Sequence, residues 1–293
     1  MARLILGTAQ FGAGYGITNS VGRIDDRSIT GIVAAAQAAG IDTFDTAADY
    51  GDSQSRLGAL PSSAERRYVT KFSLPEDSDD AVTAEVLFAR SARALGVGVL
   101  DGVLFHRVAD LADPRCAEAV DVLLAARSAG AVRRVGVSVY DVVDLELALS
   151  KFPGLDLVQI PGSIVDRRLL DSPIVSELKG NGVEIHVRSA FIQGLLLAEP
   201  ESLPDYFAPL IPVLREVSRL ADERDTSVVG LAIRFLREHP LVHGVVVGAT
   251  SIGELAATTM EWKAAGGPLP EIGVSVPEAI LDPRNWPAIK VAK

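Results

Sequence analysis

The segment DDRSITGIVAAAQAAGIDTFDT, residues 25–46, contains the unit on which the fold depends. Its first sixteen residues place apolar side chains, among them Ile29, Ile32 and Val33, on one helical face. The helix is predicted to end at Gly40, because glycine commonly follows the last helical residue. The apolar run IDTFDT comes next and predicts a short buried strand. A helix followed at once by a buried strand indicates a βαβ unit.

The same order of helix and strand recurs along the chain. Further helices are predicted at residues 78–96, ending at Gly96; at 113–130, with Asp113 as N-cap and Pro114 at the first helical position; and at 171–182, opened by Ser172 and Pro173. Strands are predicted at residues 3–7, 41–46, 67–71, 101–106, 132–139, 155–160, 183–189 and 244–250. Eight such units in about 250 residues favour a closed (β/α)8 TIM barrel of the α/β class.

No linker divides the chain, so residues 1–293 are predicted to form a single domain. The segment from about Gly266 to Lys293 is expected to form a short C-terminal tail over the barrel end. The formal net charge of −10 argues against a nucleic-acid or anionic-membrane partner. The single cysteine, Cys116, excludes an internal disulfide and suits a reducing cytosol. With neither a signal peptide nor a membrane span in the sequence, the protein is predicted to be cytoplasmic.

Polar residues stand where the predicted strands end. In strand order these residues are Thr8, Asp45, Lys71, His106, Ser138, Gln159, Arg188 with Ser189, and Gly248. The C-terminal ends of barrel strands form the catalytic face of this fold. An acid, a lysine and a histidine on three consecutive strands, with Tyr50 in the loop FDTAADYG (44–51), therefore predict one shared polar site.

Such a set of residues can move a proton. A lysine ammonium beside Tyr50 is expected to favour the phenolate and so to make the phenol a better proton donor. Asp45 would pair with Lys71, and His106 would orient a substrate oxygen. Because this relay supplies no electrons, a redox reaction needs a bound hydride carrier. The same lysine also permits a Schiff-base aldolase, so that alternative stays open.

Six motifs together resemble the aldo-keto reductase superfamily, from about Leu4 to Met260: FDTAADYG, VTKFS, LFHR, GVSVYD, VQIP and VRSAFIQGLLL. The resemblance implies that Asp45, Tyr50, Lys71 and His106 form the catalytic tetrad, with Tyr50 as the general acid. It implies a nicotinamide cofactor extended across the barrel mouth, its carboxamide held by Ser138 and Gln159. The residues implied in cofactor binding are Gly7, Thr8, Asp45, Ser138, Gln159, Arg188, Ser189, Phe191, Gly194, Leu195, Gly248, Thr250, Ser251, Glu254 and Thr258.

The sequence departs from the family pattern at several cofactor positions. Val139 stands where asparagine is usual, Thr258 replaces another common asparagine, and Arg188 stands where an aromatic residue commonly stacks on the nicotinamide. We hypothesise that Arg188 holds an anionic group of the substrate or of the cofactor. The segment GATSIGEL (248–255) lacks the Arg or Lys that usually binds a 2′-phosphate. NADPH is nevertheless the expected cofactor by family habit, with NADH as the alternative.

The predicted function is reduction of an aldehyde or ketone by NAD(P)H. The loop at 191–208 and the tail are short and moderately polar, which favours a polar, sugar-like or hydroxy-carbonyl substrate. Alternatives are a sugar or alcohol dehydrogenase working in the oxidative direction, the Lys71 aldolase, and a cofactor-binding regulatory subunit without catalysis. GAGYG (12–16) is expected to be a loop at the site rim. No metal site is expected, since Pro240 separates His239 from His243, and the sequence carries no signal for an oligomeric state.

Overall fold

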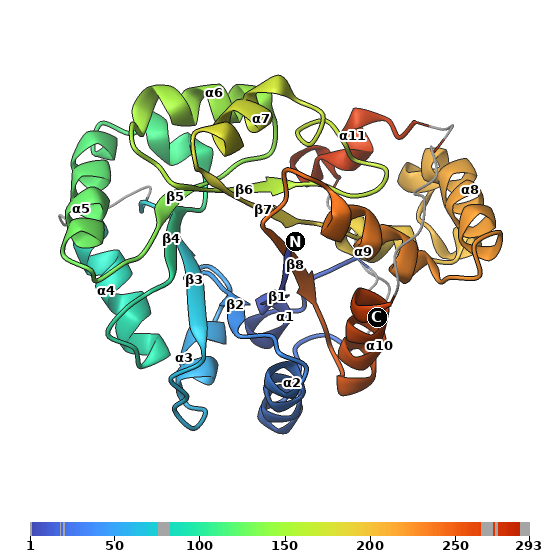
Figure 1. Cartoon of the computed structure of the whole chain (residues 1–293), viewed down its shortest axis with the longest axis horizontal. Coiled ribbons are helices and arrows are strands. Elements are labelled where there is room, and N and C mark those ends of the chain that lie inside the picture. The colour runs from blue at the N-terminus through green and yellow to red at the C-terminus, as the bar shows by residue number, and fades with distance from the viewer. Residues whose placement is uncertain are drawn as a thin grey trace.

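Eight parallel strands close into a barrel in sequence order, and helices cover its outside (Figure 1). The structure is a computed structural model that describes residues 2–17, 19, 21–75, 83–264, 272 and 275–287. The strands are β1 Arg3–Gly7, β2 Thr43–Asp45, β3 Arg67–Phe72, β4 Gly102–Phe105, β5 Val135–Ser138, β6 Leu157–Pro161, β7 Glu184–Arg188 and β8 Gly244–Gly248. All eight predicted strands are confirmed, and so is the (β/α)8 barrel.

The α-helices follow the strands in alternation. They are α1 Ala9–Gly12, α2 Asp26–Ala38, α3 Ser53–Gly58, α4 Ala84–Leu95, α5 Cys116–Ser128, α6 Val142–Lys151, α7 Pro173–Gly180, α8 Ile211–Asp222, α9 Val228–Glu238, α10 Ile252–Lys263 and α11 Glu278–Leu281. Short 3₁₀ helices are η1 Val108–Ala112, η2 Ile192–Leu197, η3 Pro200–Ser202, η4 Asp205–Leu210 and η5 Pro283–Asn285. None of the described helices is long and apolar enough to cross a membrane.

The segment 25–46 forms the unit that its sequence predicts. The Asp25 side chain caps α2 by accepting the backbone N–H of Ser28, and the apolar face of the helix is buried. Strand β2 then pairs with β1 and β3. The barrel closes where β1 pairs with β8, from Arg3 opposite Gly244 to Gly7 opposite Gly248.

Two of the predicted helices differ from the structure at their starts. Helix α5 begins at Cys116 and not at Pro114, because the Asp113 carboxylate accepts the backbone N–H and the guanidinium of Arg115 and holds a turn before the helix. Helix α4 ends at Gly96 as predicted, in a left-handed C-cap, and it begins at Ala84 with Thr83 as its cap. Residues 78–82 of the predicted helix lie outside the described residues.

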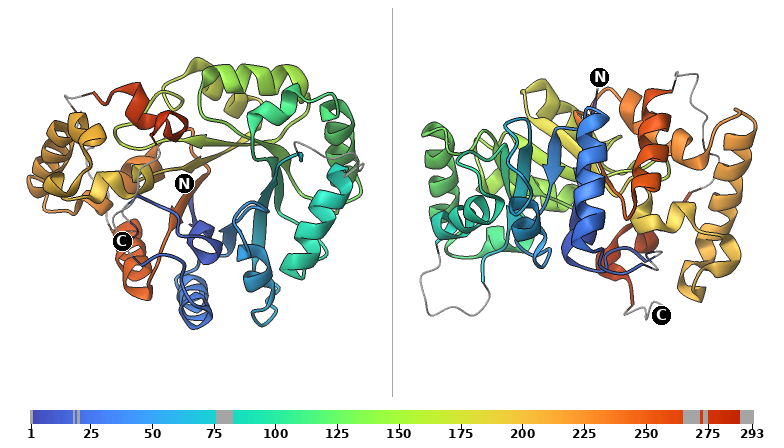
Figure 2. Two further views of the ribbon diagram at one scale, coloured as in Figure 1. Left: turned by 180° about the vertical axis from the view of Figure 1, so that it is seen from behind. Right: turned by 90° about the horizontal axis from the view of Figure 1, so that it is seen from below.

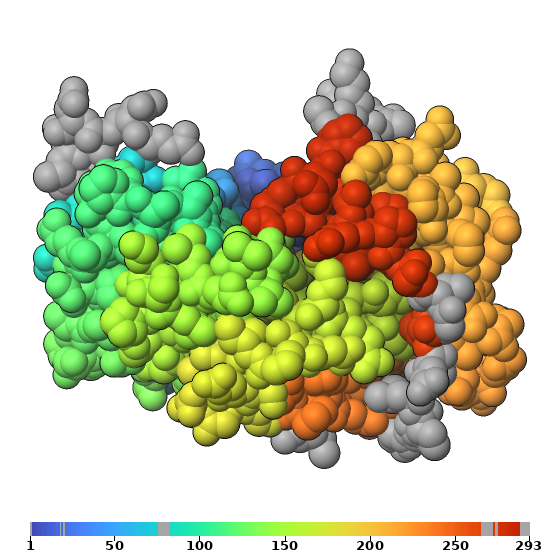
Figure 3. All heavy atoms as spheres, turned by 90° about the horizontal axis from the view of Figure 1, so that it is seen from above, coloured from blue at the N-terminus to red at the C-terminus, as the bar shows by residue number. Residues whose placement is uncertain are grey.

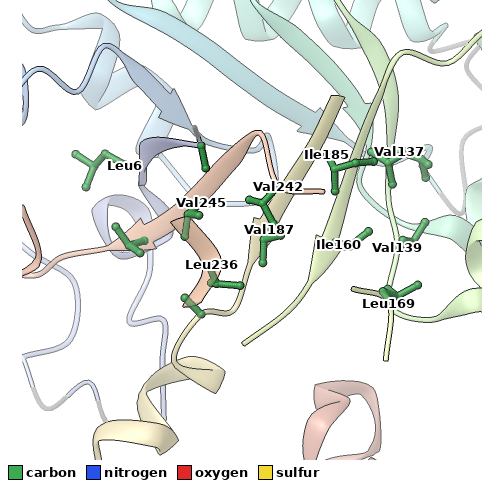
Figure 4. Packing of buried hydrophobic residues seen from close by; sticks show 14 of the residues in the cluster. Leu6, Val137, Val139, Ile160, Leu169, Ile185, Val187, Leu236, Val242 and Val245 are labelled. Atoms are coloured by element: carbon green, nitrogen blue, oxygen red, sulfur yellow. The ribbon is translucent and has the colours of Figure 1, made fainter. Parts of the chain in front are cut away.

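Apolar side chains fill both the interior of the barrel and the layer between strands and helices. Figure 4 shows the outer layer, where Val187 and Val245 lie near Leu236 of α9. Inside the barrel, Val69, Leu104 and Leu157 form a separate buried cluster. Because side chains alternate along a strand, Lys71 and Gln159 point the same way two residues further along β3 and β6. They therefore stand above this apolar plug, at the C-terminal end of the barrel.

The described part of the tail covers that same end, as predicted. In Figure 3 it lies between the α6 region and the segment around α8. Arg284 donates to Asp141 at the start of α6, and Trp286 packs edge-on against Phe207, with ring centroids 5.2 Å apart. The remaining tail residues, 265–271, 273–274 and 288–293, lie outside the described residues.

Candidate active site

A buried ion pair forms the centre of the site. Lys71 Nζ donates to Asp45 Oδ1 at 2.6 Å and to the carbonyl oxygen of Thr46 at 3.0 Å, and the lysine has no exposed surface. The second oxygen of Asp45 accepts the Nε2–H of Gln159 at 2.8 Å. Burial lowers the pKa of Lys71, and the Asp45 carboxylate opposes that shift. Strands β2, β3 and β6 thus lock one charged pair in place.

Tyr50 lies beside this pair. Lys71 Nζ is 5.1 Å from the centroid of the Tyr50 ring. Burial raises the pKa of Tyr50 well above its usual value, the Asp45 charge raises it further, and Arg188 opposes both effects. Asp45 holds Lys71 at contact distance, and the expected effect of the lysine on this pKa stays a prediction. Tyr50 remains a protonated phenol at neutral pH.

His106 stands on the other side of the phenol. Its ring meets the Tyr50 ring edge-on, with centroids 5.6 Å apart. Its Nδ1 lies 2.8 Å from Asp49 Oδ2, and that carboxylate also accepts the Ser73 hydroxyl at 2.7 Å. The hydrogen bond to His106 lowers the pKa of Asp49. Asp49 therefore orients the histidine, a contact that the sequence analysis did not predict although Asp49 directly precedes Tyr50.

Two glycines allow the loop of Tyr50 to pack against the first βα loop. A Cβ atom on Gly12 would lie 1.7 Å from the Tyr50 carbonyl oxygen. A Cβ on Gly51, where φ is +56°, would lie 2.5 Å from the carbonyl oxygen of Gly12. Only glycine permits this contact of two backbones at these positions. The contact fixes the backbone that carries the phenol.

A cavity of about 370 Å³ runs from this cluster toward the start of α10. Most of the residues predicted to bind a cofactor line it: Gly7, Thr8, Asp45, Gln159, Arg188, Ser189, Phe191, Gly194, Gly248, Thr250, Glu254 and Thr258. Three do not. Leu195 is buried in the core, Ser138 accepts the Nε–H of Arg188, and Ser251 caps α10 by accepting the Glu254 N–H.

The first βα loop supplies part of the cavity wall. Gln10, Tyr15, Gly16 and Asn19 line it together with Tyr50. The GAGYG loop thus lies at the site rim, as its position after β1 predicts. Tyr15 and Gln10 were missed as site residues. Their only sequence signal is that they follow the C-terminal end of a barrel strand.

Arg188 is held rigidly but without a counter-charge. Its guanidinium donates to Ser138, to Ser189 and to the carbonyl oxygen of Val139, and it lies 4.1 Å from the centroid of the Tyr140 ring. Within the described ranges, no carboxylate forms an ion pair with it. The Arg284 guanidinium, 4.6 Å from the same ring, pairs with Asp141, Asp144 and Asp282. Arg188 therefore presents an unneutralised positive charge at the cavity wall.

Comparison with known proteins places this geometry in context. A model of the Aldo/keto reductase family matches residues 3–264. No curated protein matches the sequence. Among solved structures, an aldo-keto reductase from Bacillus halodurans is similar with a TM-score of 0.69 and 20% identity, over 90% of this chain and 87% of that one. The glycerol dehydrogenase AKR11B4 from Gluconobacter oxydans gives 0.67 and 20%, over 95% and 88%.

A putative aldo-keto reductase from Pseudomonas aeruginosa is also similar, with a TM-score of 0.64 and 22% identity over 88% of each chain. At these identities the structural matches establish a shared fold. The family model matches most of the chain, and this match identifies the family as well as the fold.

Proposed function

The chain belongs to the aldo/keto reductase family and is an NAD(P)-dependent oxidoreductase, and we propose that it reduces a polar aldehyde or ketone with Tyr50 as the proton donor. The observation that carries the proposal is the position of Tyr50. The phenol lines the cavity and lies beside both His106 and the Lys71–Asp45 pair. Beside a hydride carrier, carbonyl reduction needs a proton donor, which Tyr50 can supply, and it is aided by a group such as His106 that orients the carbonyl oxygen.

The residues present fit a nicotinamide dinucleotide. Gln159 gives its amide N–H to Asp45, so its Oε1 atom remains a buried acceptor with no partner among the described residues. Gln159 lines the cavity, and the NH₂ group of a carboxamide would satisfy this acceptor. Gly248 and Thr250 line the cavity at its far end, at the start of α10, where an adenosine phosphate would lie. When bound, the reduced nicotinamide supplies hydride to the carbonyl carbon.

The chain's own groups then handle the proton. His106, oriented by Asp49, donates from its other ring nitrogen to the carbonyl oxygen and positions it near Tyr50. As negative charge develops on that oxygen, the phenol proton transfers to it. Burial and the Asp45 charge raise the pKa of Tyr50, so the phenol carries the proton that it donates at neutral pH.

The Schiff-base alternative is less well supported by the geometry. Lys71 Nζ is fully buried, donates to two oxygen atoms and does not line the cavity. A carbinolamine needs an accessible neutral amine. The cavity wall is mostly apolar but includes the polar side chains of Gln10, Asn19 and Gln193, which can hydrogen-bond the hydroxyl groups of a sugar-like or hydroxy-carbonyl substrate. The cytoplasm remains the predicted compartment on the basis of the single cysteine.

The test follows the hydride itself. The purified chain is incubated with reduced cofactor deuterated at nicotinamide C4 and with a panel of aldoses, ketoses and hydroxyaldehydes. NADPH, which the family resemblance favours, and NADH are both used. We expect deuterium at the former carbonyl carbon of the product.

Two other outcomes would contradict the proposal. A borohydride-trapped adduct on Lys71 without label transfer would support an aldolase. Cofactor binding without turnover on any carbonyl compound would support a regulatory subunit.

A further inference from the structure

A carboxylate of the chain's own occupies the far end of the cavity. Strand β8 ends at Gly248 and α10 begins at Ile252, with Ser251 as its cap. Glu254, in the first turn, accepts the Thr250 backbone N–H at 2.8 Å through one oxygen and the Thr250 hydroxyl at 2.8 Å through the other. Thr250 and Glu254 both line the cavity. Both hydrogen-bond donors of Thr250 are therefore already engaged by the chain's own carboxylate.

No basic side chain offsets this charge within the described cavity wall. The only cation that lines it is Arg188, whose charge acts on Tyr50 at the opposite, catalytic end. Lys263 stands in the last turn of α10. Arg27 of the neighbouring α2 lies four residues before Gly31, which packs against Ile252, but Arg27 is outside the cavity wall. Figure 2 shows α2 and α10 side by side.

A bound dinucleotide would bring its adenosine ribose to this end. NADPH carries there a 2′-phosphate with a charge of about −1.5 to −2 at neutral pH, as other phosphate monoesters do. NADH carries a 2′-hydroxyl, which can donate to a carboxylate, as it does to the acidic residue of other dinucleotide sites. Like charges placed together discriminate strongly against the wrong partner.

We propose that Glu254 makes this enzyme prefer NADH to NADPH. The inference rests on the proposed function, because it assumes that a dinucleotide binds along this cavity. The S-x-x-E pattern of Ser251 and Glu254 also resembles a helix capping box. A capping role accounts for the hydrogen bonds but leaves the negative charge beside the ribose unchanged, so the two roles of Glu254 are compatible. The proposed preference differs from the NADPH that family habit leads one to expect.

The experiment measures binding and not turnover. Quenching of the fluorescence of Trp262, which lies on α10, and of Trp286 is followed as the full chain is titrated with NADH and with NADPH at low ionic strength. We expect NADH to bind at least about tenfold more tightly. In Glu254→Gln, which keeps the size and one acceptor, NADPH should tighten by about fivefold or more, while NADH changes little. Added salt should narrow the gap in the wild type, because it screens the repulsion.

A charge-matched control separates a local from a general effect. Glu118→Gln removes the same charge from the exposed face of α5, on the other side of the barrel (Figure 1), and should leave the ratio of the two dissociation constants unchanged. NADPH binding as tightly as NADH in the wild type would overturn the inference and leave the proposed function intact. If neither dinucleotide binds, both fail. Because the wild-type ratio and its salt dependence decide the question, the inference stays testable even if Glu254→Gln is unstable.

Discussion

The two ends of the barrel both carry charged residues, and they use them differently. At the N-terminal end, Arg3, Arg134, Asp101 and Glu184 form a mutually paired set, with Arg134 Nε 2.6 Å from Glu184. At the C-terminal end, Lys71 and Asp45 are paired, whereas Arg188 has no acidic partner among the described residues. Each of these guanidinium groups at the N-terminal end has a carboxylate partner, and Arg188 at the C-terminal end has none in the described part of the chain.

Each end also holds a buried polar atom without a hydrogen-bond partner in the described part of the chain. At the N-terminal end this atom is His186 Nδ1, and at the C-terminal end it is Gln159 Oε1. Gln159 lines the cavity and His186 does not. An unpartnered group beside open space can be satisfied by a ligand, while one sealed in the core is only a cost to stability. Polar residues in barrel strands thus indicate a binding site only where their unmet bonds face a cavity.

The largest expected effect comes from removing the phenolic proton of Tyr50. In Tyr50→Phe, kcat for carbonyl reduction should fall by about 10² to 10⁴-fold, as for loss of a general acid. The dissociation constant of the cofactor and the melting temperature should stay close to wild type. Tyr15→Phe is the control, because Tyr15 also lines the cavity but lacks the contacts with His106 and Lys71. Equal losses in both variants would contradict the assignment of Tyr50.

The next largest effect is expected from breaking the buried Lys71–Asp45 ion pair. Lys71→Met leaves the Asp45 carboxylate without its cation in a fully buried position, which should lower the free energy of unfolding by about 3–5 kcal/mol. Urea denaturation measures the change. Adding Asp45→Asn should restore much of the stability, since an amide oxygen still accepts from Gln159, but it should not restore activity. If Lys71→Met alone is as stable as the wild type, the Lys71–Asp45 pair is not needed to hold the site together.

Arg188 tests whether the unbalanced charge serves substrate binding. In Arg188→Leu, KM for a carbonyl substrate that bears a carboxylate or phosphate should rise by roughly tenfold to hundredfold, the value of a charge-assisted hydrogen bond. For a neutral analogue it should change little. Arg284→Leu is a matched control, because that guanidinium contacts the same Tyr140 ring but is neutralised by acids. If the Michaelis constants of substrate and cofactor are all unchanged in Arg188→Leu, Arg188 has no role in binding anions.

The fold could be predicted from the sequence because its signals are local. Each strand is a short apolar run, and Gly40, Gly96 and Gly130 end helices where they were expected to. The start of α5 was predicted too early. Asp113 was expected to cap the helix at Pro114, but its carboxylate accepts hydrogen bonds from Arg115 instead. That choice depends on a side-chain contact, which periodicity does not describe.

The site was predictable in its residues but not in their contacts. The ends of β2, β3 and β4 supply Asp45, Lys71 and His106, and their meeting follows from the closed barrel. The bond from Gln159 to Asp45 joins strands 114 residues apart. It fixes the orientation of the Asp45 carboxylate, whose charge raises the pKa of Tyr50. Such effects depend on distances of a few ångström between side chains, which strand order alone does not give.

The smallest expected effect lies at the N-terminal end of the barrel. Although burial opposes its ionisation, the hydrogen bond to His186 and the charges of Arg3 and Arg134 lower the pKa of Glu184 to about 2. A carboxyl whose pKa is lower in the folded state than in the unfolded one stabilises the protein above its unfolded pKa. That contribution is lost as the pH falls from about 4.5 toward 2. Glu184→Gln should therefore flatten the pH dependence of the unfolding free energy in this window by about 1–2 kcal/mol.

The same substitution should leave kcat unchanged, because Glu184 lies at the opposite end of the barrel from Tyr50. Glu216→Gln, in an ion pair with Arg219 near the surface of α8, should have a much smaller effect on the acid limb, because surface ion pairs contribute little. A drop in kcat in Glu184→Gln at neutral pH would mean that the lower network is coupled to the site. The two ends would then be one electrostatic system, and the excess charge on Arg188 would have to be explained together with Glu184.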